Sequence, residues 1–208
     1  MPKERSNRTL WNRYAKLHDF EVLRFSGAAY EEIYRRITAR LTPAMDVLEL
    51  ATGTGLIALH IAASARSVTA TDFSPKMIET AQKKVVPGNV RFAVEDATAL
   101  SFTDRTYDAV VISNALHIMP DPAAALREIS RVLKPGGLLF APNFTHGHLQ
   151  GGAWNLSAAL LKLIGFQAYA KWTPPEYVAF IAEHGFAVED WRVLKAAFPL
   201  VYLEASLR

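Results

Sequence analysis

The sequence predicts an α/β fold: a doubly wound, mostly parallel sheet with helices on both of its faces. Three observations carry this prediction. Between residues 46 and 144, short apolar segments alternate in single file with segments of helical periodicity. The first apolar segment, 46–50, runs straight into a turn that holds two glycines. The chain ends with two further strand-like segments around a short turn, which predicts an antiparallel hairpin.

The individual elements each have a local signal. Five apolar residues at helical spacing predict an N-terminal helix that Pro43 ends: Tyr30, Ile33, Tyr34, Ile37 and Leu41. Further helices are expected over 55–65 and after Ser74-Pro75 and Asp121-Pro122, where an N-cap residue precedes proline. The last of these is expected to end at the turn 134–137. Seven strands are expected, at 46–50, 67–72, 89–96, 107–113, 137–144, 186–195 and 197–208.

The whole chain, residues 1–208, is expected to form one domain. An N-terminal helical lid at 1–42 precedes the core at 43–145. An apolar helical insertion at 146–172, with a Gly-Gly pair near its start, interrupts the alternation of strands and helices. A capping box, Thr173 to Glu176, then opens the C-terminal helix and hairpin at 173–208. We expect the lid and the insertion to enclose a small or amphipathic ligand.

Composition excludes several classes of protein. The chain has no cysteine, which rules out disulfides, thiolate nucleophiles and Cys-ligated zinc. The formal net charge of +3 is mild and does not call for a nucleic-acid partner. The first residues contain no apolar signal-peptide core, and no apolar stretch approaches bilayer length. A cytoplasmic protein without a membrane span is therefore expected, as a monomer or a homodimer.

The glycine turn has the spacing of a nucleotide-binding site. Gly53, Gly55 and Ala58 fit the pattern G-x-G-x-x-G/A between a strand and a helix. Asp72, at the end of the next strand and 17 residues past Gly55, is placed to accept both ribose hydroxyls. The alternative is a turn that serves only to pack a strand against a helix.

Glu49 immediately precedes this turn and decides which nucleotide is expected. A pyrophosphate prefers helix-terminus amides without a nearby anion, so Glu49 would repel it if it faces the turn. S-adenosylmethionine (SAM) carries an ammonium, a sulfonium and no phosphate, so the same carboxylate would attract it. The glycines would let the backbone approach the methionine part. The alternative for Glu49 is a solvated strand-end acid, or one paired with Arg or Lys.

These residues lie in a segment that resembles a known family. VLELATGTG resembles motif I of the class I, Rossmann-like SAM-dependent methyltransferases, and TATDFSPKMIETA, VRFAVEDATALSF, YDAVVISNALHIM and LREISRVLKPGGLLF continue the resemblance in order. It covers about residues 45–143 and is closest to the small-molecule, quinone or lipid type. Ala51 departs from the pattern, because many members have glycine there. We expect alanine to be tolerated if its φ is negative.

The resemblance implies a role for each matching position. Glu49, Ala51, Gly53, Gly55 and Asn114 would line the methionine part of the cofactor, and Asp72 would hold the ribose. Phe73 and Met77 would lie near the adenine, whose amino group Asp96 would bind and to which Ala97 would offer its backbone. Tyr14, from the N-terminal lid, is expected to close over the cofactor. The alternatives are a turn cap for Asp96 and ordinary helix packing for Tyr14.

Methyl transfer from a sulfonium is an in-line displacement that leaves S-adenosylhomocysteine, so the protein mainly supplies alignment and a closed, apolar site. His117 follows the fourth strand and is expected to be a catalytic base or an acceptor-binding residue; the alternative is a histidine bonded to backbone. His146 and His148 are expected to line the acceptor pocket. No third metal ligand accompanies them, so no metal is expected.

The expected acceptor is a small molecule. The segment Ser113-Asn114-Ala115-Leu116 differs from the Asn-Pro-Pro-Tyr of amino-methylating DNA enzymes, and no RNA-binding appendage is visible. Two other functions stay open at this point. The glycine spacing also fits an NAD(P)-dependent oxidoreductase, although the chain lacks a Tyr-x-x-x-Lys pair. A non-catalytic SAM-binding protein would retain the cofactor residues without an acceptor site.

Overall fold

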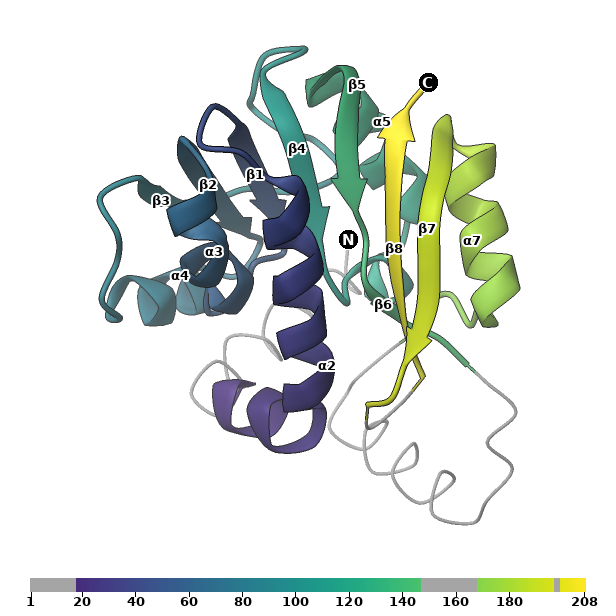
Figure 1. The fold of residues 1–208 in the computed structure, drawn as a ribbon, viewed down its shortest axis with the longest axis horizontal. Helices are drawn as coiled ribbons and strands as arrows, with labels where there is room; N and C mark the ends of the chain where they lie inside the picture. Colours follow the sequence, from purple (N-terminus) through teal and green to yellow (C-terminus); the bar gives the residue numbers. More distant parts are fainter. Residues whose placement is uncertain (1–17, 147–167, 197–198) are drawn as a thin grey trace.

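We describe the fold from a computed structural model, which describes residues 18–146, 168–196 and 199–208 (Figure 1). A single eight-stranded sheet runs through these residues in the order β3-β2-β1-β4-β5-β8-β6, and β7 pairs with β8. The first five strands along the chain are all parallel: β1 Asp46–Leu50, β2 Ser67–Asp72, β3 Val90–Val94, β4 Tyr107–Ile112 and β5 Leu133–Phe140. The predicted doubly wound, mostly parallel sheet is confirmed.

The strand order reverses direction at β1. In the sheet, β2 lies on one side of β1 and β4 on the other. The loops that follow β1 and β4 therefore leave toward opposite faces of the sheet. In open α/β sheets this switch point is where ligands bind. Glu49, the glycine turn and Asn114 all lie at this edge of the sheet.

Helices cover both faces, as predicted. They are α2 His18–Arg40, α3 Leu56–Ile61, α4 Pro75–Gln82, α5 Pro122–Val132 and α7 Pro174–Glu183, with short 3-10 turns η1 Ala62–Ser64 and η2 Leu116–Ile118. The sequence-based caps are present. The side chain of Ser74 accepts from the N–H of Met77 at 3.2 Å, and that of Asp121 accepts from Ala124 at 2.9 Å. These bonds satisfy amides that the first helical turn leaves unpaired.

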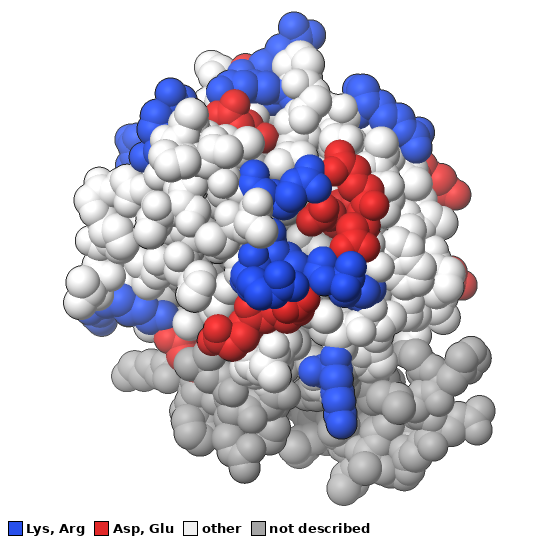
Figure 2. Space-filling view, viewed as in Figure 1, with Lys and Arg blue, Asp and Glu red and all other residues white. Residues whose placement is uncertain are grey.

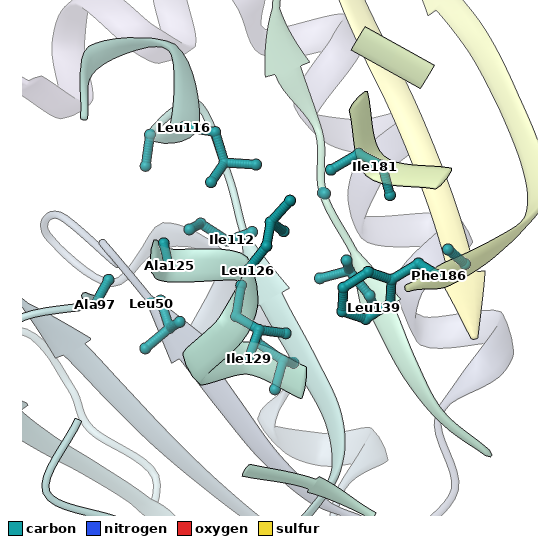
Figure 3. Packing of buried hydrophobic residues seen from close by; sticks show 14 of the residues in the cluster. Leu50, Ala97, Ile112, Leu116, Ala125, Leu126, Ile129, Leu139, Ile181 and Phe186 are labelled. Carbon is teal, nitrogen blue, oxygen red and sulfur yellow. The ribbon is translucent and has the colours of Figure 1, made fainter. Parts of the chain in front are cut away.

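Two hydrophobic layers enclose the sheet. On one face, α5 and α7 pack Leu126, Ile129 and Ile181 against strand residues such as Ile112 and Leu139 (Figure 3). On the other face, the apolar stripe of α2 and the buried side of α3 pack against Val47 and its neighbours in β4. Since side chains alternate along a strand, Glu49 points to the same face as Val47, beneath α2 and α3.

The C-terminal hairpin completes the sheet. β7 Phe186–Leu194 and β8 Leu200–Leu207 are antiparallel, and β8 inserts between β7 and β5. The eighth strand, β6 Asn143–Phe144, has only two residues and pairs with the start of β8, which extends the seven strands expected.

β5 begins earlier than predicted. Leu133 is buried and already pairs with Tyr107, so the strand starts directly after α5, and the expected turn at 134–137 becomes an irregularity within the strand. Gly136 takes a φ of 71° there. The prediction of a turn at 134–137 is wrong, because the burial of Leu133 in the core places these residues inside the strand.

Ion pairs fasten α2 to the hairpin. Arg36 contacts Asp190 at 2.9 Å, and Arg40 contacts Glu204 at 2.7 Å and Glu189 at 2.8 Å. Figure 2 shows basic and acidic side chains gathered together on this face of the molecule. The helix is thereby held across the sheet, with its first residues toward the glycine turn (Figure 1). The residues of the predicted lid before 18 and of the insertion at 147–167 lie outside the described residues.

Candidate functional site

The turn after β1 is built from left-handed backbone. Ala51 has a φ of 52°, Gly53 of 57° and Gly55 of 82°. The condition under which alanine was expected to fit at 51, a negative φ, is not met. A non-glycine residue in this region costs about 1–2 kcal/mol. Ala51 therefore holds strain at the mouth of the turn, and nearby contacts such as the bond from the N–H of Thr52 to the carbonyl of Thr71, at 2.8 Å, stabilise the turn.

Gly55 has a packing role in addition to its backbone conformation. A Cβ placed on Gly55 would lie 2.8 Å from Cζ of Phe92 in β3. Phe92 thus closes the turn against the neighbouring strands. The contact with Phe92 and the positive φ both require glycine at this position, and the approach of a ligand to Gly55 stays a prediction.

Glu49 is neither solvated nor paired with an Arg or Lys among the described residues. Its side chain is 2% exposed, and its Oε2 has no hydrogen-bond partner there. Burial raises the pKa of Glu49 to about 8, and the negative charge of Asp72 adds to this. The carboxyl group is thus mostly protonated at neutral pH, and a ligand cation would have to displace that proton to form an ion pair.

Other buried polar atoms near Glu49 also lack partners. Within the described part of the chain they are the hydroxyl oxygens of Thr52 and Ser113 and Oδ1 of Asn114. These residues follow β1 and β4, the two strands that flank the switch point. Because buried polar groups are nearly always hydrogen-bonded, a cluster of such atoms indicates a place for a ligand rich in N–H donors. The ammonium of SAM is such a group.

Asp72 is fixed at the carboxyl end of β2. Its Oδ2 accepts the N–H of Gly53 at 2.8 Å and its Oδ1 the N–H of Ser74 at 2.8 Å. A carboxylate has about four acceptor positions, so these two bonds do not by themselves use up its capacity to accept. Phe73 follows and is 40% exposed, while Met77 is buried at the start of α4.

Asp96 follows β3 and caps its own turn. Its Oδ1 accepts from the N–H of Thr98 at 2.9 Å and from the hydroxyl of Thr98 at 2.7 Å. The turn cap considered from sequence is thus present. No bond to Oδ2 exists among the described residues, which leaves this oxygen able to accept from an adenine amino group. Ala97 is buried next to Leu50 and Ala125 in the core (Figure 3).

The side chain of Asn114 contacts Tyr30, a residue that the sequence analysis placed only in the apolar stripe of the N-terminal helix. The side-chain N–H₂ of Asn114 donates to the hydroxyl of Tyr30 at 3.2 Å, and Asn114 has a φ of 53°. Burial raises the pKa of Tyr30, which stays a neutral phenol. The only sequence signal was a tyrosine hydroxyl, shared with Tyr34, in an otherwise apolar stripe. Tyr30 therefore brings α2 into the site.

His117 lies in η2 on the β5 side of the switch point. Its Nδ1 is 3.0 Å from Oδ1 of Asn143, whose amide donates to the carbonyl of Phe144 at 3.0 Å, so Nδ1 carries the imidazole proton. Burial lowers the pKa of His117 to about 4, and the imidazole is neutral at pH 7. The bond to a side chain differs from the backbone bond considered from sequence. Burial also lowers the pKa of His146, two residues after Phe144.

The structure thus brings Glu49, Asp72 and Asn114 to one edge of the sheet, with His117 and His146 beside them. Asp96 lies one strand further out. Tyr14 and His148 lie outside the described residues. Within the described residues, no three metal-ligating side chains come together, and no helix is long and apolar enough to span a membrane. The buried oxygen atoms at this edge suit the ammonium and ribose of SAM.

The chain is similar to known methyltransferases. A family description, "Methyltransferase domain", matches residues 48–141. A demethylmenaquinone methyltransferase from Corynebacterium urealyticum is 33% identical over 180 residues, or 84% of this chain and 75% of the relative. One from Mycolicibacterium gilvum is 34% identical over 167 residues, or 79% of this chain and 72% of the relative.

A solved structure shares the fold. One chain of the complex between the Haloferax volcanii Trm112 methyltransferase activator and a methyltransferase has a TM-score of 0.78 at 20% identity, and 96% of each chain is covered. The strand order, the residues at the switch point and these similarities agree. The chain belongs to the class I SAM-dependent methyltransferases.

Proposed function

We propose that this methyltransferase moves the methyl group of SAM to a small aromatic acceptor of the quinone class, related to demethylmenaquinone. The observation that carries the cofactor site is the group of unpartnered buried polar atoms around Glu49 and Asn114. The relatives named for demethylmenaquinone support the acceptor class. The choice of acceptor is the finer part of the proposal.

The cofactor residues are proposed as follows. Glu49 and Asn114 bind the ammonium of SAM, with Ala51, Gly53 and Gly55 along the methionine part. Asp72 binds the ribose, since its carboxylate is already oriented by two backbone amides. Asp96, Ala97, Phe73 and Met77 surround the adenine, and Tyr14 covers the site; these assignments stay predictions.

The protein's part in the chemistry is alignment and exclusion of water. The cofactor supplies a methyl group on a cationic sulfur, and transfer breaks the S–C bond, forms a bond to the acceptor and releases a proton from it. His117 is proposed to position the acceptor, with His146 and His148 alongside. With its pKa at about 4, His117 is a weak base, so positioning through a neutral imidazole suits it better than proton removal.

The first test is calorimetric titration with SAM, S-adenosylhomocysteine and NAD in parallel. We expect micromolar affinity for the two adenosyl compounds and no heat with NAD. The variant Glu49→Gln keeps the size of the side chain and removes its charge, so it should bind S-adenosylhomocysteine about tenfold more weakly. Binding of NAD alone would instead favour the alternative of an NAD(P)-dependent oxidoreductase.

The second test is methyl transfer from labelled SAM to reduced 1,4-naphthoquinones with and without an isoprenoid chain. We expect transfer to at least one of them. Cofactor binding without transfer to these or to a broad panel of small acceptors would favour the non-catalytic alternative. The expectations of a cytoplasmic monomer or homodimer that binds no nucleic acid stay predictions.

A further inference from the structure

The hydroxyl of Tyr169 is another buried polar group without a hydrogen-bond partner among the described residues. Its oxygen is buried and makes no hydrogen bond to the described residues. Tyrosine hydroxyls that are withdrawn from water usually find a partner, because the lost hydration is otherwise not replaced. The unliganded protein therefore has an unused hydrogen-bond donor at this position.

Tyr169 is fixed next to the acceptor side of the site by its backbone. Its N–H donates to the carbonyl of His117 at 2.8 Å, and the N–H of Ala170 donates to the same carbonyl at 3.1 Å. A further bond, from the N–H of His146 to the carbonyl of Trp172 at 2.7 Å, ties the same segment to the loop after β6. Since His117 bonds to Asn143 in β6, the backbone of Tyr169 lies near β6, beside the proposed methionine subsite.

The loop that the backbone of Tyr169 contacts carries neutral aromatic side chains. His117 is an uncharged imidazole bonded to Asn143, and Phe144 packs against the imidazole edge-to-face, with ring centroids 6.2 Å apart. Such surroundings favour a flat, uncharged ring that can pack against the aromatic groups. A ring oxygen would give the Tyr169 hydroxyl the partner that it lacks.

We propose that the Tyr169 hydroxyl donates a hydrogen bond to a ring oxygen of the acceptor, which makes Tyr169 a specificity-determining residue for methyl transfer. This inference rests on the proposed function. Beyond that function, it states that Tyr169 lets the protein distinguish an oxygen-bearing ring from the same ring without oxygen. A site built to bond an oxygen rejects analogues that lack it more strongly than an apolar pocket rejects a change of size.

The test compares two probes on protein saturated with S-adenosylhomocysteine: 1,4-dihydroxynaphthalene, and 1,4-dimethylnaphthalene, in which a methyl group replaces each hydroxyl. The variant is Tyr169→Phe, and the matched control is Tyr177→Phe, whose hydroxyl donates to the carbonyl of Ala141 at 2.8 Å in the core. We expect wild type to prefer the diol at least tenfold, and Tyr169→Phe to lose about tenfold of that preference. Affinity for S-adenosylhomocysteine should not change.

Thermal denaturation separates binding from structure. Because the Tyr169 hydroxyl has no partner to lose, Tyr169→Phe should melt at or above the wild-type temperature, whereas Tyr177→Phe should melt below it. Unchanged discrimination in Tyr169→Phe, or equal loss of both probes with a lowered melting temperature, would overturn the inference. Wild-type protein that binds S-adenosylhomocysteine but neither probe would contradict the proposed acceptor class instead.

Discussion

The side-chain amide of Asn114 donates to the hydroxyl of Tyr30, and this bond joins the helix α2 to the carboxyl end of β4. Since the N–H₂ end of the amide is engaged, Oδ1 of Asn114 is the end left for a ligand. The orientation of a proposed cofactor residue thus depends on a residue 84 positions earlier in the chain.

Replacement Tyr30→Phe tests this relationship. Without the hydroxyl, the amide of Asn114 is free to rotate, and we expect affinity for S-adenosylhomocysteine to fall about fivefold to tenfold, as for the loss of one hydrogen bond. Calorimetric titration measures the change. The control is Tyr34→Phe, one helical turn further along α2, where affinity should stay at the wild-type value. Equal effects of both variants would show that helix packing, and not Asn114, is responsible.

The protonation of Glu49 predicts a pH dependence of stability. Its pKa is about 8 in the folded chain against 4.5 for an ordinary glutamate, so the folded state retains a proton that the unfolded state has lost. The stabilising contribution is complete below pH 4.5 and is lost as the pH rises through 8. The unliganded protein should therefore lose stability across this window, and Glu49→Gln should lose less. Thermal denaturation at several pH values measures the difference.

The same carboxyl group predicts proton release on cofactor binding. An ammonium beside Glu49 favours the ionised form, so binding at pH 6.5 should release up to one proton, and the cofactor affinity should rise with pH. Titration with S-adenosylhomocysteine in two buffers of different ionisation enthalpy counts the protons. Glu49→Gln should release fewer protons than wild type. Equal proton release by the two proteins would remove Glu49 as the source.

The strain at Ala51 predicts a stabilising substitution. Glycine adopts a φ of 52° without the steric penalty of a Cβ, so Ala51→Gly should raise the free energy of unfolding by about 0.5–1 kcal/mol, after the added freedom of glycine in the unfolded chain. Urea denaturation measures this. The matched control is Ala125→Gly inside α5, which should lower the free energy of unfolding by about 1 kcal/mol. A loss of stability in both variants would contradict the prediction.

The first turn of α2 is fastened to the glycine turn through Asp19. Its carboxylate accepts from the hydroxyl of Thr54 and contacts Nζ of Lys84 at 2.6 Å, and Lys84 also donates to the carbonyl of Thr54 at 2.7 Å. We expect Lys84→Met to speed hydrogen exchange at the start of α2, with a change in global stability below about 1 kcal/mol, because the pair is only partly buried.

The neighbouring lysine provides the control for this anchor. Lys83 contacts Glu79 on the exposed side of α4, at 2.8 Å. Lys83→Met should leave exchange in α2 at the wild-type rate. Equal protection of α2 in wild type and Lys84→Met would show that the ion pairs to the hairpin alone hold the helix.

The sequence by itself determined the order of strands and helices, the glycine turn, and the acids Glu49, Asp72 and Asp96 at strand ends. These features are local. Apolar periodicity, N-cap residues followed by proline, and glycine spacing act within a few residues, so they can be recognised along the chain. Because ligands bind at the carboxyl ends of the strands in open α/β sheets, the same local pattern also predicted one shared ligand for these acids.

The tertiary structure alone decided the properties of those residues. The left-handed backbone at Ala51, the protonated state of Glu49, the bond from Asn114 to Tyr30, and the neutral state of His117 all depend on packing against distant segments. Burial determines how much free energy it costs to ionise a side chain. Contacts between residues far apart in sequence determine where a strained backbone conformation is retained. The sequence therefore identified the groups of the site, while their charge, orientation and hydrogen-bonding capacity followed from the fold.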